Sequence, residues 1–214
     1  MYKENKKLVI ITSIVCFIPV IAGVILYKQL PDTMITHWNT EGEPNGYMSK
    51  FVAAIVLPSV LLIVNLFAPM LLRIDPKYDN MGDKTKALIF WIIPAVSIFS
   101  ASATLSAGLG YASRIDVAAP FFIGLLFVII GNYLPKMKQT YTVGIKLPWT
   151  LHDEENWNRT HRMAGYLWVV CGLLIMASAL IPCSKYVLGV VIAAMVIAPT
   201  VYSYMLYRKS EAAE

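Results

Sequence analysis

Charged residues are scarce in this sequence, and this scarcity limits the kind of protein it encodes. Only 14% of the 214 residues are Asp, Glu, Lys or Arg, whereas 57% are hydrophobic and the mean hydropathy is +0.61. A soluble domain usually has about a quarter of its residues charged. One water-soluble core cannot bury so much apolar surface, so we expect a lipid bilayer to be the second solvent.

The net charge of +5 does not indicate a nucleic-acid-binding protein. Its Lys and Arg residues fall in short segments between apolar runs, where they report membrane topology first. We therefore predict no direct binding to nucleic acid.

Cysteine is also scarce. Cys16, Cys171 and Cys183 are odd in number, and their spacing fits no metal site and no disulfide framework. We expect them to act as small apolar residues, and we predict neither a metal nor another cofactor.

Six long apolar runs account for most of the chain. They cover residues 8–27, 51–72, 87–112, 117–134, 164–182 and 186–207. Most have about 20 residues, which as a helix is enough to cross ~30 Å of hydrocarbon. The runs are continuously apolar rather than alternating, which favours helices over barrel strands. The predicted fold class is an all-α membrane protein with six transmembrane helices. The middle of each run has no Asp, Glu, Lys or Arg, which argues against a proton pump or a charge-coupled carrier.

The Lys and Arg residues predict the orientation of these helices. Fourteen of the 18 lie before the first run, after the last, or in the second and fourth connections, and four lie in the other three connections. Cytoplasmic segments carry the excess of Lys and Arg, so both termini are predicted to be cytoplasmic.

Two long connections divide the predicted functional surface between the two sides of the membrane. Residues 1–112 form a three-helix half with an extracytoplasmic loop at 28–50, and residues 113–214 form a second half with a cytoplasmic loop at 135–163. A weak internal echo relates the two loops, and it raises the alternative of an inverted repeat, as in many transporters. The matching positions are Leu30-Pro31, Gly42 and Pro44 in the first loop and Leu134-Pro135, Gly144 and Pro148 in the second.

The chemical focus of the outer loop is His37-Trp38-Asn39. Histidine can donate, accept or bind a metal, and it titrates near neutral pH, so a recognition site is one interpretation. The other interpretation, which composition favours, is a hydrogen-bonded histidine that fixes the loop. Residues 43–46 have turn chemistry, with Asn45-Gly46 suited to positive φ.

The inner loop contains the signal for the start of a helix. Thr150, with Asp153 three residues later, predicts a helix that begins near Leu151 and continues into the fifth span. On it Asp153, Trp157 and His161 share a face. Asp153 could orient His161 for catalysis or for a metal, but we favour Trp157 and His161 as anchors at the membrane interface.

The two loops together resemble the SdpI family of bacterial membrane proteins. In the outer loop the resemblance rests on Leu30-Pro31, His37-Trp38-Asn39, Gly42, Pro44, Tyr47 and Lys50. In the inner loop it rests on Gly131-Asn132, Gly144, Pro148-Trp149-Thr150-Leu151, Trp157 and His161-Arg162. Lys146 departs from the family pattern, which favours arginine there. The exchange keeps the charge but loses the bidentate fork.

The resemblance implies a non-enzymatic immunity protein in a bacterial plasma membrane. It implies protection against a secreted peptide toxin, and signalling in which the engaged protein recruits a cytoplasmic transcriptional repressor. His37, Trp38, Asn39 and their neighbours would form the outer contact surface, and the residues from Asn132 to Arg162, Lys146 and Asp153 included, the inner one. The alternatives are a small-molecule or lipid transporter, which the echo motivates, and a membrane enzyme that uses Asp153 and His161.

Overall fold

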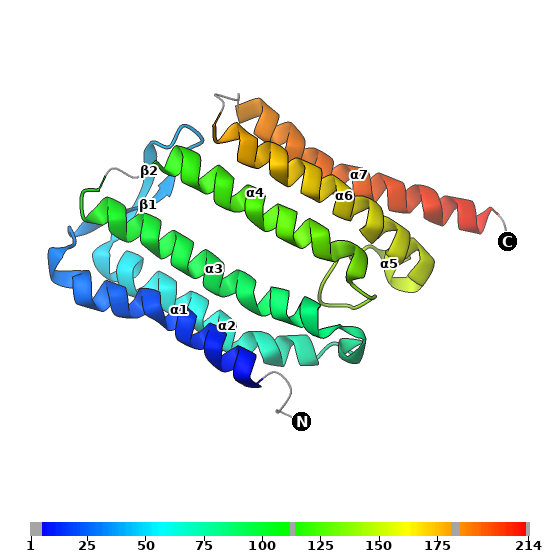
Figure 1. Ribbon diagram of the computed structural model, residues 1–214, viewed down its shortest axis with the longest axis horizontal. Coiled ribbons are helices and arrows are strands. Elements are labelled where there is room, and N and C mark those ends of the chain that lie inside the picture. Colours follow the sequence, from blue (N-terminus) through cyan, green and yellow to red (C-terminus); the bar gives the residue numbers. More distant parts are fainter. Residues whose placement is uncertain (1–5, 112–113, 181–184, 213–214) are drawn as a thin grey trace. The chain divides into compact units, whose positions relative to one another are not determined.

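Six long helices make up most of the computed structural model, which describes residues 6–111, 114–180 and 185–212, with the side chains of 185–187 left out. Cys183 lies outside the described residues. The long helices are α1 (Lys6–Leu26), α2 (Leu57–Arg73), α3 (Asp83–Gly108), α4 (Ile115–Tyr133), α6 (Glu154–Ser178) and α7 (Lys185–Glu211) (Figure 1). The short elements are η1 (Tyr27–Gln29), η2 (Val52–Val56), η3 (Tyr78–Asn80), η4 (Leu134–Lys136) and α5 (Pro148–His152), with strands β1 (Thr33–Trp38) and β2 (Pro44–Ser49).

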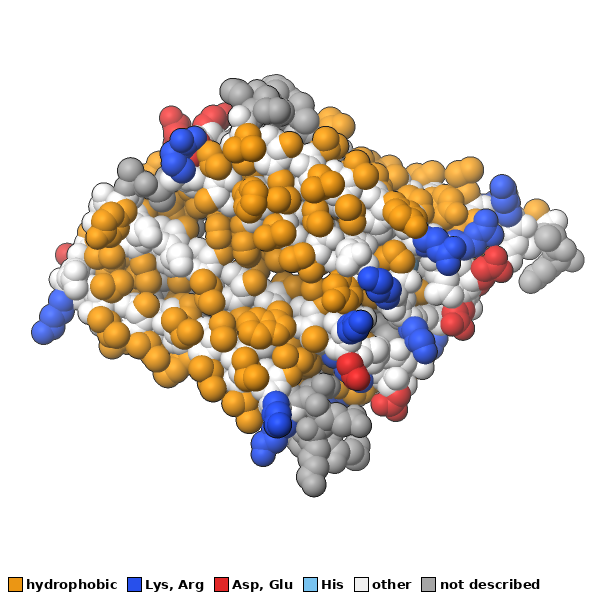
Figure 2. All heavy atoms as spheres, in the orientation of Figure 1, with side chains coloured by type: hydrophobic (Ala, Val, Ile, Leu, Met, Phe, Trp, Pro, Cys, Tyr) orange, Lys and Arg blue, Asp and Glu red, His pale blue; other side chains and the backbone are white. Residues whose placement is uncertain are grey.

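In the part of the chain that the structure describes, six helices are long and apolar enough to cross a bilayer. Their segments are Lys6–Gln29, Val52–Arg73, Asp83–Gly108, Ile115–Lys136, Glu154–Ser178 and Leu188–Glu211. Hydrophobic side chains cover much of the face drawn in Figure 2, and residues such as Ile14 and Leu173 are more than half exposed. Apolar helix surface of this extent requires lipid rather than water. The prediction of six helices of spanning length is confirmed.

Several helix boundaries differ from the apolar runs. Helix α6 begins at Glu154, ten residues before the run at 164–182, because its first turns are polar on the surface but are held by contacts inside the protein. Helix α3 ends at Gly108, four residues before the end of its run. Hydropathy identifies the lipid-facing part of a helix, but it gives no signal for polar turns that extend the helix beyond that part.

The prediction of an all-α fold is wrong for one segment. Residues 33–49 form an antiparallel hairpin in which Thr33 lies opposite Ser49 and Ile35 lies opposite Tyr47. Irregular register follows at His37 and Trp38. The predicted turn at Glu43–Gly46 is also displaced: the residue with positive φ is Gly42, at +81°, and Gly46 lies within β2, opposite His37. The hairpin carries Thr, Ile and Trp on β1, which favour a strand, but it is too short to show clear alternation.

The chain divides into two compact units. One contains Met1–Leu71 and Ala87–Asp116, and the other contains Leu72–Lys86 and Val117–Glu214. The connection between α2 and α3 therefore belongs to the unit that holds α4 to α7. Because of this segment, the two units cannot be separated by a single cut in the sequence.

A polar contact joins α1 and α2 in the first unit. The buried Asn65 side chain donates from Nδ2 to Ser13 Oγ at 3.1 Å and lies 3.4 Å from Thr12 Oγ1. Interhelical hydrogen bonds of this kind substitute in a membrane for the hydrophobic effect, which has little force between apolar helices in lipid.

Two reciprocal glycine contacts bring α4 and α6 together in the second unit. A Cβ at Gly124 would lie 2.5 Å from the Gly172 carbonyl oxygen, and one at Gly172 would lie 2.7 Å from the Gly124 oxygen. Gly131 and Gly165 repeat this relation seven residues further along each helix, in opposite chain directions. The antiparallel helices are thus close enough for backbone to touch backbone, which only small residues permit.

A proline in α7 frees a carbonyl that a neighbouring helix satisfies. Pro199 has no N–H to donate to the oxygen of Met195, four residues earlier. The indole Nε1 of Trp168 donates to that oxygen at 3.0 Å. The break in the helical ladder is therefore compensated from α6, as a lipid-embedded helix requires.

We predict that Gly172→Ala destabilises the protein, because its methyl group would meet the Gly124 carbonyl. Overpacking of this kind costs about 1–3 kcal/mol. The midpoint of thermal unfolding in detergent should fall for Gly172→Ala. Gly189→Ala in α7, where no atom lies within 4 Å of the new Cβ, is the matched control and should leave the midpoint unchanged or raise it. Equal midpoints for the two variants would contradict the close approach.

Candidate functional site

The tip of the hairpin is organised by Asn39. Its Oδ1 accepts from the backbone N–H groups of Glu41 at 3.0 Å and Glu43 at 2.8 Å, and its Nδ2 donates to a Glu43 carboxylate oxygen. Gly42 completes the turn with positive φ, and a Cβ there would lie 2.8 Å from Asp116 Cβ. Asn39 and Gly42 are thus accounted for by the conformation of the turn.

His37 fixes the hairpin from its exposed side. Its Nδ1 shares a hydrogen bond with Asn45 Oδ1 on the neighbouring strand, and because an amide oxygen only accepts, Nδ1 donates. This agrees with the interpretation that a hydrogen-bonded histidine fixes the loop. The Nε2 atom lies on the other side of the exposed ring and leaves the histidine able to contact a ligand as well.

The remaining predicted residues of this surface have different environments. Lys50 forms an ion pair with Asp32 at 2.8 Å, and this hydrogen bond and charge lower the pKa of the Asp32 carboxyl and raise that of Lys50. Tyr47 is 59% exposed, and its hydroxyl approaches the oxygen of Pro44. Trp38, opposite Pro44, is half-buried. The exposed part of the hairpin is therefore aromatic and polar, with Tyr47 as its largest exposed side chain.

In the second unit, His161 holds the loop that follows α4. Its Nε2 accepts from the Ile145 backbone N–H at 2.9 Å, and its Nδ1 faces the Trp157 carbonyl oxygen at 2.8 Å. An N–H can only donate and a carbonyl can only accept, so the ring must be neutral with its proton on Nδ1. The ring is 1% exposed. His161 is a fixed structural acceptor in this arrangement.

Gly144 and Trp157 pack on the same ring. The indole of Trp157 stacks on His161 with centroids 4.0 Å apart, and its Nε1 donates to the oxygen of Met137 at 2.8 Å. Gly144 has φ of +118°, and a Cβ there would lie 2.7 Å from His161 Nε2. Both φ and space require glycine at this position. Residues Met137, Gly144, Ile145, Trp157 and His161 form what we call the His161 cluster.

The expectation that Trp157 and His161 anchor an interfacial segment is wrong, because both are buried inside the protein. Trp157 is 0% exposed. The hypothesis that Asp153 orients His161 is also wrong, since both ring nitrogens bond backbone groups. Helical spacing brought Trp157 and His161 together as predicted, but the partner of the pair is the preceding loop, which periodicity cannot reveal.

Asp153 instead caps α6. Its Oδ1 accepts from the N–H groups of Glu155 at 2.8 Å and Asn156 at 3.2 Å. The predicted helix start at Thr150 is displaced, because Thr150 lies in α5, where its hydroxyl accepts from the Leu147 N–H at 2.9 Å. A helix does run from this region into the fifth span, but Asp153 breaks it into α5 and α6.

Trp149 attaches α5 to α7. Its Nε1 donates to Ser203 Oγ at 2.9 Å, and its ring stacks on Tyr207 with centroids 5.9 Å apart. Asn156 donates to the Ser203 carbonyl at 2.9 Å. The other predicted residues of the inner surface are exposed: Asn132, Lys146, Pro148 and Arg162. They lie outside the His161 cluster, and Lys146 Nζ donates to the Thr142 carbonyl oxygen at 3.1 Å.

Sequence reasoning missed Asp75, a buried carboxylate between α2 and α3. Its Oδ2 accepts from the N–H groups of Tyr141 and Thr142 and from Thr142 Oγ1, each at 2.8 Å, and its Oδ1 accepts from the N–H of Lys77. Burial alone would raise the pKa of Asp75, but these hydrogen bonds together hold it below its ordinary value. Lys77 Nζ in turn donates to Gln139 Oε1, and Gln139 Nε2 donates to the oxygen of Thr150 at 2.8 Å. In the sequence, Asp75-Pro76 indicates a turn but not the burial of the carboxylate.

Comparison with known proteins assigns the family. A model of the SdpI/YfhL protein family matches residues 136–203, and a model of a domain of unknown function (DUF1648) matches residues 14–62. The immunity protein SdpI of Bacillus subtilis (strain 168) is 30% identical over 211 residues, covering 95% of this chain and 97% of that protein. This chain belongs to the SdpI/YfhL protein family. The resemblance seen in the sequence is confirmed, and with its six apolar helices the protein is a multi-pass membrane protein. No solved structure matches.

The segment matched by the SdpI/YfhL family model contains the His161 cluster and the contacts of Trp149 with α7. It runs from Lys136 in η4 through the His161 cluster to Ser203 in α7. The first segment, 14–62, contains the whole hairpin. The two matched segments therefore hold the hairpin and the His161 cluster, and of the predicted surface residues Asn132 lies outside them.

We predict that His161→Phe opens the loop at residues 137–147. Phenylalanine keeps the stacking on Trp157, but it leaves the Ile145 N–H without its acceptor, which costs about 1–3 kcal/mol when the group is buried. Hydrogen exchange of the Ile145 amide should accelerate accordingly. Arg162→Ala, the exposed neighbour, should leave that exchange unchanged, and unchanged exchange in both variants would contradict the structural role of His161.

We also predict an acid-sensitive attachment at Asp75. Because its pKa is lowered by folding, the carboxylate stabilises the folded state fully above its ordinary pKa of about 4, and this stabilisation is lost as pH falls through the lowered value. Amide exchange at Tyr141 and Thr142 should therefore rise in acid. In Asp75→Asn the exchange should already be fast at neutral pH and should lose this pH dependence. A parallel acid response in wild type and variant would show that another group is responsible.

Proposed function

We propose that this protein is an integral-membrane immunity protein that protects a bacterium against a secreted peptide toxin. The observation that carries the proposal is the match to the immunity protein SdpI over nearly the full length of both chains. A match of this extent includes both the hairpin and the His161 cluster, so both surfaces are available for the same role.

The proposed orientation follows from charge. The excess of Lys and Arg on one set of connections favours cytoplasmic termini in a bacterial plasma membrane. In this orientation the hairpin faces outward, where a secreted peptide would arrive, and the His161 cluster faces the cytoplasm. The two surfaces would then serve different partners.

We infer that the hairpin makes the outer contact. Its turn and its strand pairing hold Tyr47 and His37 exposed on a short, hydrogen-bonded scaffold. An exposed aromatic side chain on a rigid element contributes much binding area at a low entropic cost. Residues His37, Trp38, Asn39, Gly42, Pro44, Tyr47 and Lys50 form this proposed surface.

We infer that the second role, recruitment of a transcriptional repressor, uses the surface around the His161 cluster. Residues 72–86 are held there by Asp75 and continue directly into α2 and α3 of the first unit. A change in the packing of those helices would act on this segment and so on the loop at 137–147. Binding outside would in this way alter the surface presented inside. Asn132, Lys146, Pro148, Trp149, Asp153 and Arg162 border this surface, and Gly144, Thr150, Trp157 and His161 hold its conformation.

The proposal predicts protection from killing. The host is Bacillus subtilis strain 168 without its own SdpI, exposed to the secreted peptide fraction of the parent strain, with and without this protein. Survival should rise with expression, and Tyr47→Ala should reduce the protection because it removes the largest exposed side chain of the hairpin. Tyr111→Ala, another exposed tyrosine in a different segment, is the matched control and should protect as well as wild type. Equal killing with and without the protein would remove the immunity proposal.

A further inference from the structure

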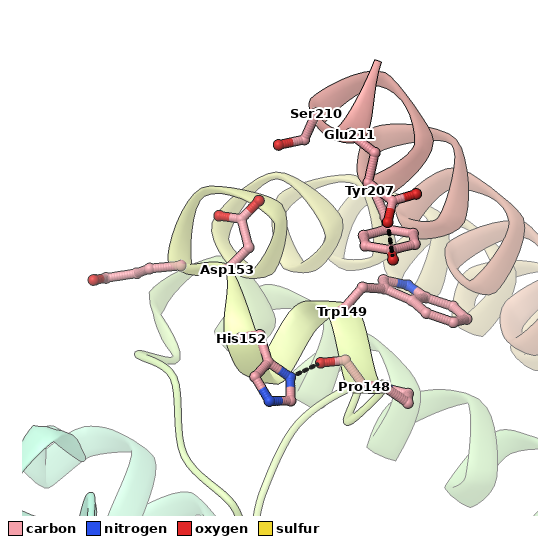
Figure 3. A pocket seen from close by; sticks show the side chains of 8 residues that line it. Pro148, Trp149, His152, Asp153, Tyr207, Ser210 and Glu211 are labelled. Carbon is pink, nitrogen blue, oxygen red and sulfur yellow. Dashed lines mark hydrogen bonds between the residues drawn. The ribbon is translucent and has the colours of Figure 1, made fainter. Parts of the chain in front are cut away.

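A cleft of about 740 Å³ lies where α5 and the start of α6 meet the end of α7. Figure 3 shows Trp149 and Tyr207 beside one another in it, with His152 and Asp153 from the α5–α6 junction and Ser210 and Glu211 from α7. Its volume falls within the range of ligand-binding clefts and far exceeds the space that one metal ion needs. Among the described residues no group of three or more His, Cys, Asp or Glu side chains is placed to hold a metal.

The lining of this cleft is rich in acceptors and has no cation. Asp153, Glu154 and Glu211 contribute three carboxylates, and no Lys or Arg is among the lining residues. Asp153 uses Oδ1 to cap α6, which leaves Oδ2. His152 donates from Nδ1 to the Pro148 oxygen, so its Nε2 is an acceptor.

Two aromatic rings, stacked on one another, complete the lining of the cleft. The indole of Trp149 and the ring of Tyr207 are nearly parallel, with an interplanar angle of 21°. The Trp149 ring is held by its bond to Ser203, and the Tyr207 hydroxyl donates to Glu211. Aromatic faces carry negative charge and attract cations, Arg most often.

A neighbouring cleft gives an internal comparison. It shares Asp153 and Ser210 but is also lined by Glu155, Arg159 and Lys209. There the carboxylate of Glu155 is paired with Arg159 at 3.2 Å. On the other side of Asp153 no Lys or Arg lines the cleft, although Arg208, outside the lining, lies 3.9 Å from a carboxylate oxygen of Glu211.

The geometry points to the cleft around Trp149, Glu154 and Tyr207 as a binding site for an arginine side chain presented by a peptide segment of a partner protein. A guanidinium has five N–H donors, no acceptor and a flat face, which matches carboxylates, a histidine nitrogen and stacked aromatic rings. The protein has a net charge of +5, which favours contact with anionic surfaces. The acidic cleft repels such surfaces and therefore favours a cationic partner. The inference deepens the proposed function, on which it rests for placing the partner in the cytoplasm.

The test uses the full-length protein in nanodiscs of zwitterionic lipid and a fluorescein-labelled peptide of alternating glycine and arginine. A second peptide has citrulline in place of every arginine, which keeps the shape and removes the charge. We expect the arginine peptide to bind at least tenfold more tightly than the citrulline peptide, and binding to weaken with salt.

The matched protein variants are Glu154→Gln and Glu155→Gln. Both residues lie in the first turn of α6, so the exchange changes the charge near the helix end equally, but only Glu154 lines the proposed cleft. We expect about tenfold weaker binding for Glu154→Gln and for Glu211→Gln, which lines the cleft from α7, and unchanged binding for Glu155→Gln. Toxin is absent from this assay, so its outcome is separate from that of the killing experiment.

Three results would overturn the inference. The first is no binding of the arginine peptide by the wild-type protein. The second is equal weakening by Glu154→Gln and Glu155→Gln, which would mean general attraction to an acidic helix end. The third is displacement of the peptide by spermine at a lower concentration than by a second arginine peptide, which would make a free polyamine the occupant.

Discussion

The hydrogen bond from the Ile145 N–H to His161 Nε2 is the constraint on which the second surface depends. It requires a neutral ring with its proton on Nδ1, and the Trp157 carbonyl receives that proton. Protonation of Nε2 would place two donors against each other in a buried site, which nothing nearby could compensate. The hydrogen bond that His161 adds between the loop and the start of α6 therefore forms only while the ring is neutral, whereas the bond from Trp157 to the Met137 oxygen does not depend on it. Gly144 is fixed by the same ring, since any side chain there would occupy its place.

Sequence reasoning reached the helices and failed at the loops for a physical reason. Hydropathy identifies lipid-facing helices because bilayer thickness sets their length, and the six runs follow from this alone. The hairpin at 33–49 is held by cross-strand pairing and by the Asn39 turn, and neither leaves a periodic signal in so short a segment. Trp157 and His161 were paired correctly by helical spacing, but their burial depends on residues 137–147, whose fold follows from long-range contacts.

Asp75 illustrates the same limit in a stronger form. An aspartate in a charged connection, which also holds Asp79 and Asp83, looks solvated in the sequence. Asp75 is nevertheless buried, and it accepts hydrogen bonds from two backbone N–H groups and a hydroxyl more than 60 residues away. These bonds hold residues 72–86 with the second unit while both ends of the segment continue into the first. Residues 72–86 are therefore attached to the loop at Tyr141 and Thr142 through one carboxylate.

The echo between the two loops can now be judged by its parts. Gly42 and Gly144 both have positive φ. Leu30 and Leu134 are both buried where a short 3-10 turn ends a long helix: Leu30 follows η1, and Leu134 is the first residue of η4. The segments that follow differ, because one pairs with itself as a hairpin and the other lies on α6 through His161 and Trp157. The shared leucines and glycines therefore account for the helix end and the turn in each loop. The residues between them determine what each loop contacts. A common exit with different contacts fits the proposed role, in which one surface meets a peptide and the other a regulator, since the two surfaces can change independently while the helices that carry them stay the same.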